Sequence, residues 1–182
     1  MIYKGCRFRS ILEAKWAAFF DGMGWNWTYE AFSLYGWYPD FVIHGLTMDF
    51  LVEVKPFAKE EEFRTLEPKI GDAVLRSQKW WSSPILLLGY AVVPRPVFYK
   101  NRCTNVGHVG YFLTFNSPDP HNIKATYDPA AIVDDDLFYR RCSMIKGGDF
   151  GLALENDQSC DRAILEFNTA GALTQWKRKE TD

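Results

Sequence analysis

The segment WYPDFVIHGLTMDFLVEVKP, residues 37–56, places two carboxylates and a lysine within largely apolar sequence. β-branched and aromatic residues in YPDFVIH (38–44) and DFLVEVKP (49–56) predict two strands. GLT between them suits a tight turn, so we expect an antiparallel hairpin. Burying an unpaired charge is costly. The charged groups of this hairpin must therefore neutralise one another or hold a cation between them.

Strand geometry predicts where the charged side chains meet. Residues two apart in a strand share a face, so Glu53 and Lys55 point the same way as Leu51. Asp40 lies near the start of the first strand, and Glu53 lies near the end of the second. Because antiparallel pairing brings those two ends together, we expect Asp40, Glu53 and Lys55 to gather at one edge of the sheet.

These residue types suit phosphoryl chemistry. Mg²⁺ prefers one or two carboxylates, together with waters and phosphate oxygens. Asp40 and Glu53 offer the carboxylates, and Val54 offers a backbone carbonyl beside them. A bound metal would polarise a phosphoryl oxygen and lower the pKa of a bound water. Lys55 could orient that water, help to deprotonate it, or stabilise charge on the phosphate.

Residue patterns on either side of the hairpin predict an α/β (α+β) fold with one helix-flanked sheet. Helical spacing of apolar residues, aromatic or β-branched runs and turn-forming residues support the individual elements. The expected elements are a helix at 10–23, a strand at 25–32, a turn at 33–37, a charged helix at 59–81 bent near Pro68 and Gly71, and a strand at 84–93 that is covered on both faces.

Residues 94–182 are expected to extend this core, which we place at residues 1–93. This C-terminal extension either packs on the core as part of one domain or forms an appendage. Its expected elements are a hairpin over 94–102 and 106–115, a surface loop at 116–131, a helix or strand at 134–145, a short strand at 149–154, and a helix at 160–180 that is broken or frayed near Gly171.

PD at 39–40 and EVK at 53–55, in this order of elements, resemble the PD-(D/E)xK nuclease superfamily of restriction endonucleases, Holliday-junction resolvases and many phage enzymes. The helix RSILEAKWAAFF and the strand PILLLGY are similar to core elements of that fold, and the pattern looks like small nucleases of phages and mobile elements. The resemblance covers residues 7 to about 93. It implies a restriction-endonuclease-like mixed central sheet flanked by helices, with a diverged C-terminal extension.

The resemblance also implies an activity, a Mg²⁺-dependent endonuclease that hydrolyses phosphodiester bonds in DNA with a metal-activated water. Mn²⁺ would substitute for Mg²⁺. In this interpretation Asp40, Glu53 and the Val54 carbonyl hold the metal, Lys55 assists the water, and Glu13 is an accessory ligand and catalytic carboxylate.

The same interpretation gives candidate DNA contacts on the two helices that flank the motif. Arg7 and Arg9 lie beside the first helix, and Gln78 and Lys79 lie on the helix that follows the motif. Small phage relatives often carry a cysteine-rich ribbon after the core. The cysteines here lack any C-x-x-C pair, so no zinc site is inferred.

The site residues also have purely structural interpretations. Glu13 follows Ser10 at the spacing of a capping box. Asp40 could shape a turn. Glu53 and Lys55 could form a structural ion pair or a solvated strand face. These alternatives stay open at the level of sequence.

Composition sets bounds on the class of protein. The 182 residues are 47% hydrophobic and 16% aromatic, which is typical of an ordered globular domain. A net charge of −2 gives no overall attraction to nucleic acid but leaves a local basic groove open. No apolar run approaches the ~20 residues of a membrane span, and MIYKGCRFRS lacks a signal-peptide core. We therefore expect a cytoplasmic protein of a bacterium or phage-infected cell, with no membrane partner.

Two alternative functions stay open beside the nuclease. The chain could be a non-catalytic nucleic-acid-binding or assembly module, since some of its seven tryptophans could stack on single strands. It could also be the nuclease subunit of a larger nucleic-acid-processing complex, or a homodimer. Dependence on a metal ion separates an enzyme from a binding module.

Overall fold

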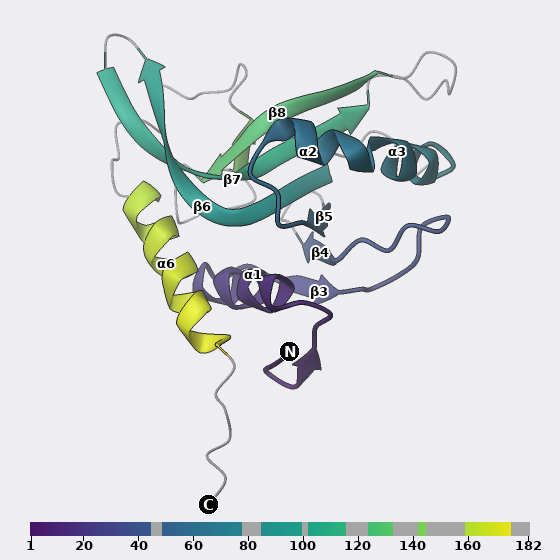
Figure 1. Ribbon diagram of the computed structural model, residues 1–182, viewed down its shortest axis with the longest axis horizontal. Helices are drawn as coiled ribbons and strands as arrows, with labels where there is room; N and C mark the ends of the chain where they lie inside the picture. The colour runs from purple at the N-terminus through teal and green to yellow at the C-terminus, as the bar shows by residue number, and fades with distance from the viewer. Residues whose placement is uncertain are drawn as a thin grey trace, which may run out of the picture.

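The computed structural model describes residues 1–44, 49–77, 85–99, 102–115, 124–132, 142–144 and 159–175. It is a mixed α+β structure (Figure 1). Its helices are α1 (Ile11–Gly22), α2 (Glu60–Phe63), the 3₁₀ turn η1 (Arg64–Leu66), α3 (Glu67–Leu75) and α6 (Ser159–Leu173). Its strands are β1 (Ile2–Tyr3), β2 (Cys6–Arg7), β3 (Trp27–Tyr29), β4 (Phe41–His44), β5 (Asp49–Val54), β6 (Ile85–Tyr99), β7 (Arg102–Phe115), β8 (Ala125–Ile132) and β9 (Cys142–Met144).

One mixed sheet of seven strands has the order β3-β4-β5-β6-β7-β8-β9. The pair β5–β6 is parallel, and the other neighbours in the sheet are antiparallel. Parallel neighbours need a crossover connection, and α2 and α3 lie in the chain between β5 and β6. The predicted hairpin is confirmed as β4 and β5, in which Phe41 lies opposite Val52.

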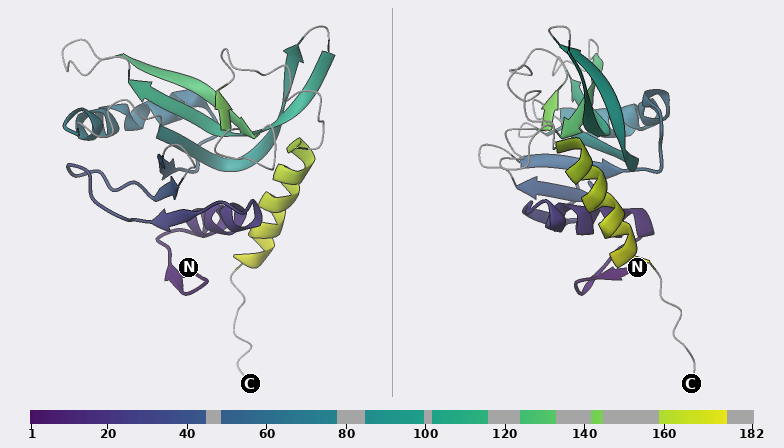
Figure 2. Two further views of the ribbon diagram at one scale, coloured as in Figure 1. Left: turned by 180° about the vertical axis from the view of Figure 1, so that it is seen from behind. Right: turned by 90° about the vertical axis from the view of Figure 1, so that its left-hand side faces the viewer.

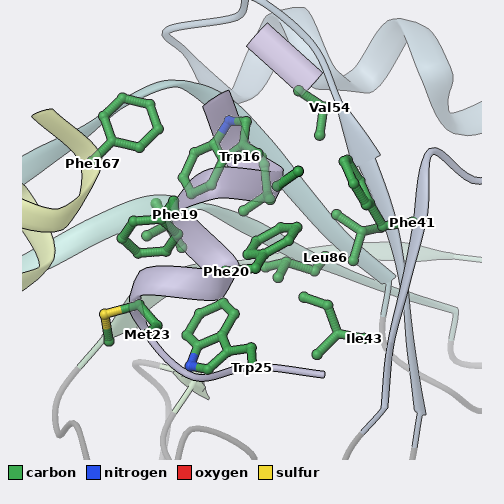
Figure 3. Packing of buried hydrophobic residues seen from close by; sticks show 14 of the residues in the cluster. Trp16, Phe19, Phe20, Met23, Trp25, Phe41, Ile43, Val54, Leu86 and Phe167 are labelled. Carbon is green, nitrogen blue, oxygen red and sulfur yellow. The ribbon is translucent and has the colours of Figure 1, made fainter. Parts of the chain in front are cut away.

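One face of the sheet packs against α1 and α6. Trp16, Phe19 and Phe20 of α1 are fully buried, because helical spacing places them on one side of the helix. The rings of Phe20 and Phe41 of β4 meet edge to face, with centroids 5.2 Å apart. Figure 3 shows these rings between the strands and Phe167 of α6. This aromatic layer holds α1 against the end of the hairpin.

The opposite face of the sheet packs against α2 and α3. Ile70 of α3 is buried against this face. Strand β6 contributes to both cores: Leu86 and Leu88 belong to the α1 side, and Ile85 and Leu87 belong to the α3 side. The expected strand covered on both faces is therefore confirmed, and the two views in Figure 2 show helices on both sides of the sheet.

The charged segment at 59–81, predicted as a helix in two pieces joined by a bend near Pro68 and Gly71, is divided in the structure, but the division falls before Pro68. α2 is one short turn that ends at Phe63, η1 follows, and α3 ends at Leu75. Pro68 lies in the first turn of α3 rather than in the middle of a helix. A proline is tolerated there because the first N–H groups of a helix have no partner within the helix.

The second half of the chain continues the sheet. The expected division between residues 93 and 94 falls inside β6, which runs on to Tyr99. The predicted antiparallel pairing is confirmed, since 94–99 pairs with 102–107 of β7, but 94–99 continues β6 rather than starting a separate strand. The loop predicted at 116–131 is wrong over 125–131, where β8 pairs with β7. Pairing along a neighbouring strand outweighs the local turn preference of Asp128 and Pro129.

The other expected boundaries shift by a few residues. β3 is shorter than the strand predicted at 25–32, and α6 passes through Gly171 and ends at Leu173. The GLT turn, the strand at 149–154 and most of 134–145 lie outside the described residues. No helix within the described ranges is long and apolar enough to cross a membrane.

Candidate active site

The β4–β5 hairpin brings Asp40 and Glu53 to one edge of the sheet. Asp40 directly precedes β4, and the register of Phe41 opposite Val52 places it beside Glu53. Asp40 is 0% exposed and Glu53 is 6% exposed. Asp40 Oδ2 accepts a hydrogen bond of 2.8 Å from the backbone N–H of Val54. The buried carboxylate of Asp40 therefore links the start of β4 to the end of β5.

The ammonium of Lys55 lies among the oxygens that the sequence assigns to a metal. Its Nζ is 2.7 Å from Glu53 Oε1 and 3.6 Å from Asp40 Oδ2. It also donates a hydrogen bond of 3.0 Å to the carbonyl oxygen of Val54. Three oxygens from three residues thus surround a single positive charge. The structure places together all four residues that the sequence pattern singles out at this edge.

Burial and the two carboxylates set the electrostatics of this edge. Burial raises the pKa of Asp40 to about 6, and the negative charge of Glu53 adds to the rise. Burial opposes the charge of Lys55, but the carboxylates of Glu53 and Asp40 outweigh it and raise the pKa of the ammonium. The edge therefore favours a bound cation. The burial of Glu53 excludes the interpretation that it lies on a solvated strand face. A purely structural ion pair between Glu53 and Lys55 is still consistent with this geometry.

A tight turn positions a further residue against Glu53. Leu34 and Trp37 exchange backbone hydrogen bonds of 2.7 and 2.9 Å, and Tyr35 and Gly36 between them have φ values of 46° and 89°. Two left-handed residues are typical of a type I′ turn, so the turn predicted at 33–37 is confirmed. The Trp37 indole N–H donates a hydrogen bond of 2.8 Å to Glu53 Oε2.

Arg9 pairs with carboxylates of the site. Its guanidinium binds Asp40 Oδ1, and its Nε is 2.8 Å from Glu30 Oε1 and 4.0 Å from Glu13 Oε2. The sequence pattern predicts Arg9 as a phosphate contact, and in the structure its largely exposed side chain pairs with these acids. Glu30 was not singled out, because its only sequence context is a short strand. Arg7 is exposed in β2 and does not line the cavity described below.

Glu13 takes part in half of the capping box that its spacing predicts, since its carboxylate binds the Ser10 hydroxyl and the Arg9 N–H rather than the Ser10 N–H. Its backbone N–H donates to Ser10 Oγ at 3.0 Å, and the Ser10 hydroxyl donates to Glu13 Oε1 at 2.9 Å. The Tyr29 hydroxyl donates to Glu13 Oε2 at 2.6 Å, and burial followed by this bond raises the pKa of Tyr29 to about 12. Glu13 also lines the same cavity as Glu53. The capping interaction and a position at the site therefore coexist.

A cavity of about 240 Å³ opens onto Glu53 and Lys55. It lies between the start of α1, the turn before β4 and the η1–α3 segment, and its other lining residues are Arg9, Glu13, Trp37, Tyr38, Leu66, Lys69 and Ile70. Sequence reasoning missed Trp37, Tyr38 and Lys69. Trp37 and Tyr38 directly precede the motif in sequence, but nothing local shows that they face its carboxylates, and only tertiary folding brings Lys69 beside it. Gln78 and Lys79 lie outside the described residues.

The oxygen donors at this edge match Mg²⁺ in kind. In the described ranges no three His, Cys, Asp or Glu side chains form a metal-binding group. Asp40 and Glu53 offer two carboxylates, and the Val54 carbonyl adds a third hard oxygen on the same cation position. Such a set suits Mg²⁺, which keeps several waters and binds through one or two carboxylates plus substrate phosphate.

Comparison of the chain with protein-family models, with curated proteins and with solved structures finds no match in any of the three. The chemistry of the cavity and its carboxylates is therefore the basis for a functional interpretation.

Proposed function

We propose that this chain is a Mg²⁺-dependent deoxyribonuclease of the PD-(D/E)xK superfamily, with a restriction-endonuclease-like core, that hydrolyses phosphodiester bonds within DNA. One observation carries the proposal: Asp40 Oδ2, Glu53 Oε1 and the Val54 carbonyl oxygen surround one cation position beside a cavity. The mixed sheet with helices on both faces supports the assignment of the fold.

Each residue of the site would have its own role in hydrolysis. Asp40, Glu53 and the Val54 carbonyl would hold Mg²⁺, or Mn²⁺ in its place. The Lys55 ammonium would then be displaced from these oxygens toward the cavity. The bound ion would polarise a phosphoryl oxygen and acidify a water. Lys55, whose pKa is raised against the effect of burial by Glu53 and Asp40, would donate hydrogen bonds to the attacking water or to the phosphate as negative charge develops. The water oxygen would attack phosphorus as the water gives up a proton to solvent, and the bond to the sugar oxygen would break as that leaving oxygen takes up a proton from solvent.

Neighbouring side chains hold this arrangement in place. Trp37 fixes one carboxylate oxygen of Glu53, which leaves Oε1 directed at Lys55. Arg9 holds the Oδ1 atom of Asp40, which leaves Oδ2 on the side of Val54 and Lys55. Glu13 binds Arg9 and Tyr29 and would act as an accessory group rather than as a direct ligand.

Cleavage of labelled DNA tests this proposal. Purified protein is incubated with single-stranded, duplex, flap and four-way-junction DNA in Mg²⁺, Mn²⁺ or EDTA. We expect products with either metal and none in EDTA. Glu53→Gln and Lys55→Ala should each reduce the cleavage rate by at least about 100-fold, since each removes a group that acts on the reacting atoms.

Glu61→Gln is the matched control for these variants. Glu61 lies exposed on α2 and does not line the cavity, so the cleavage rate of Glu61→Gln should equal that of the wild type. Cleavage that continues in EDTA, or that survives in both Glu53→Gln and Lys55→Ala, would contradict the proposal.

A non-catalytic nucleic-acid-binding module is the second candidate, and one observation favours it. In the structure protein cations already neutralise the buried carboxylates, because Arg9 binds Asp40 and Lys55 binds Glu53. Such a network can serve stability alone. This candidate predicts DNA binding that is the same in Mg²⁺ and in EDTA, with no products in either.

A further inference from the structure

The carboxylates of the candidate site are largely buried beside a small cavity. Asp40 is 0% exposed and Glu53 is 6% exposed, and the cavity beside them measures about 240 Å³. Pockets that enclose drug-sized ligands start at roughly 300 Å³. A cavity of this size is too small to enclose a double helix. A strand that has left its duplex can bring both a phosphate and its neighbouring base into such a cavity.

Tyr38 provides an aromatic surface at the mouth of this cavity. It is 53% exposed and lines the cavity beside Trp37. Trp37 itself is 1% exposed and belongs to the core, so the indole offers no stacking face. An exposed aromatic ring beside a phosphate-binding groove is the feature on which proteins stack unpaired bases. Bases in a duplex are already stacked on one another and cannot use it.

Lys69 provides a charge at the same mouth from the opposite side. It lies exposed on α3 and lines the cavity. Within the described ranges Lys69 forms no ion pair, whereas Arg9 and Lys55 in the same cavity are paired with carboxylates. Of these three cations, Lys69 is therefore the one available to a phosphate group.

We propose that the substrate of this site is single-stranded DNA, bound with one base stacked on Tyr38 and the adjoining phosphate paired with Lys69. The inference rests on the proposed nuclease function and names its substrate class. It makes Tyr38 and Lys69 substrate-binding residues at the entrance, separate from the carboxylates that act on the phosphate.

Binding in EDTA tests the stacking contact without any cleavage. Fluorescence anisotropy is measured with a labelled single-stranded oligonucleotide and with the corresponding duplex. Single strands should bind more tightly than duplex. Tyr38→Ala should weaken binding of single strands about 5- to 150-fold, the range expected for loss of one stacked base, and Tyr38→Phe should keep it. Tyr90→Ala is the matched control, because Tyr90 is also 53% exposed but lies on β6 away from this cavity.

The salt dependence of binding tests the phosphate contact. A lysine that pairs with one phosphate of a single strand contributes about 0.7 to the slope of log affinity against log salt concentration. Lys69→Ala should lower the slope by about that amount. Lys59→Ala should leave the slope unchanged, because Lys59 lies at the N-terminal cap of α2 and does not line the cavity. An unchanged slope in Lys69→Ala would overturn the assignment of Lys69.

The outcomes separate this inference from the nuclease proposal. Equal affinities of Tyr38→Ala and Tyr90→Ala for single strands, or cleavage of duplex in preference to single strands, would overturn the inference and leave the nuclease standing. Binding of single strands that depends on Tyr38, without metal-dependent cleavage products, would support the inferred binding site and contradict the proposed nuclease activity.

Discussion

Trp37 ties the turn before β4 to the carboxylate of Glu53. Its side chain is 1% exposed, and its indole N–H lies 2.8 Å from Glu53 Oε2. The other oxygen of the same carboxylate receives Lys55 at 2.7 Å. A buried carboxylate needs partners for both oxygens, because an unpaired buried acceptor is costly. Trp37 is therefore a positioning residue for Glu53.

Replacing Trp37 with Phe should destabilise the protein by about 1–3 kcal/mol, because it leaves Glu53 Oε2 buried without a donor. Urea denaturation measures the change in the free energy of unfolding. The double variant Trp37→Phe/Glu53→Gln completes a double-mutant cycle with the two single variants. A coupling energy near zero would show that the indole and the carboxylate act independently and would contradict the assignment.

At the scale of elements, Asp21 fastens the N-terminal hairpin to the core. It lies in the last turn of α1, and its carboxylate accepts hydrogen bonds from Tyr3 at 2.9 Å and from Trp27 at 3.0 Å. Lys4, in the turn between β1 and β2, is 2.9 Å from the same carboxylate. The carboxylate of Asp21 in α1 thus binds both the β1–β2 hairpin and β3. Burial opposes the charge of Asp21, but the bonds from Lys4, Trp27 and Tyr3 outweigh it and lower its pKa.

A lowered pKa makes the contribution of Asp21 depend on pH. The contribution is fully present above the pKa of the unfolded chain, about 3.9, and is lost as the pH falls through the lower pKa of the folded state. Asp21→Asn should therefore be about 1–2 kcal/mol less stable than the wild type at pH 7. The gap should shrink below about pH 4. Denaturant melts at several pH values measure it.

Asp72→Asn serves as the control for this prediction. Asp72 forms an exposed ion pair with Arg76 one turn along α3, and such pairs are worth little. Its stability at pH 7 should lie within about 0.5 kcal/mol of the wild type. A gap between Asp21→Asn and the wild type that is equally large at pH 3 and pH 7 would refute the charge-based explanation.

At the scale of the whole molecule, α6 joins the end of the chain to its beginning. Phe167 is 2% exposed, and its ring centroid lies 4.6 Å from that of Trp16 in α1. Lys15 Nζ lies 3.7 Å from the centroid of the Phe167 ring. Figure 1 shows α6 lying across the end of α1 and beside β6. The helix therefore completes a core that residues 1–93 would leave open on this side.

Phe167→Ala should lower the free energy of unfolding by about 3–5 kcal/mol, because it empties a buried aromatic site. Leu165→Ala on the same helix is the control, since Leu165 is 63% exposed and its loss should cost less than about 0.5 kcal/mol. We expect a single unfolding transition in both variants, followed by circular dichroism in urea. Equal stability of the two variants would show that α6 is not part of the common core.

Local patterns in the sequence predicted the part of the fold that depends on short-range interactions. Helix α1, the β4–β5 hairpin, the turn before Trp37 and the buried strand β6 follow from apolar spacing and turn residues. The gathering of Asp40, Glu53 and Lys55 also follows, because strand alternation and antiparallel pairing depend on neighbours in sequence.

Only the tertiary structure decided the parts that depend on partners far away in the chain. β8 forms where turn residues predict a loop, because β7 satisfies its backbone groups. Arg9 binds the buried Asp40 although its own side chain is largely exposed, and Lys69 reaches the cavity because α3 packs against one face of the sheet. A side chain's partner depends on which distant elements pack together, and the energy of that packing is not encoded in any single stretch of sequence.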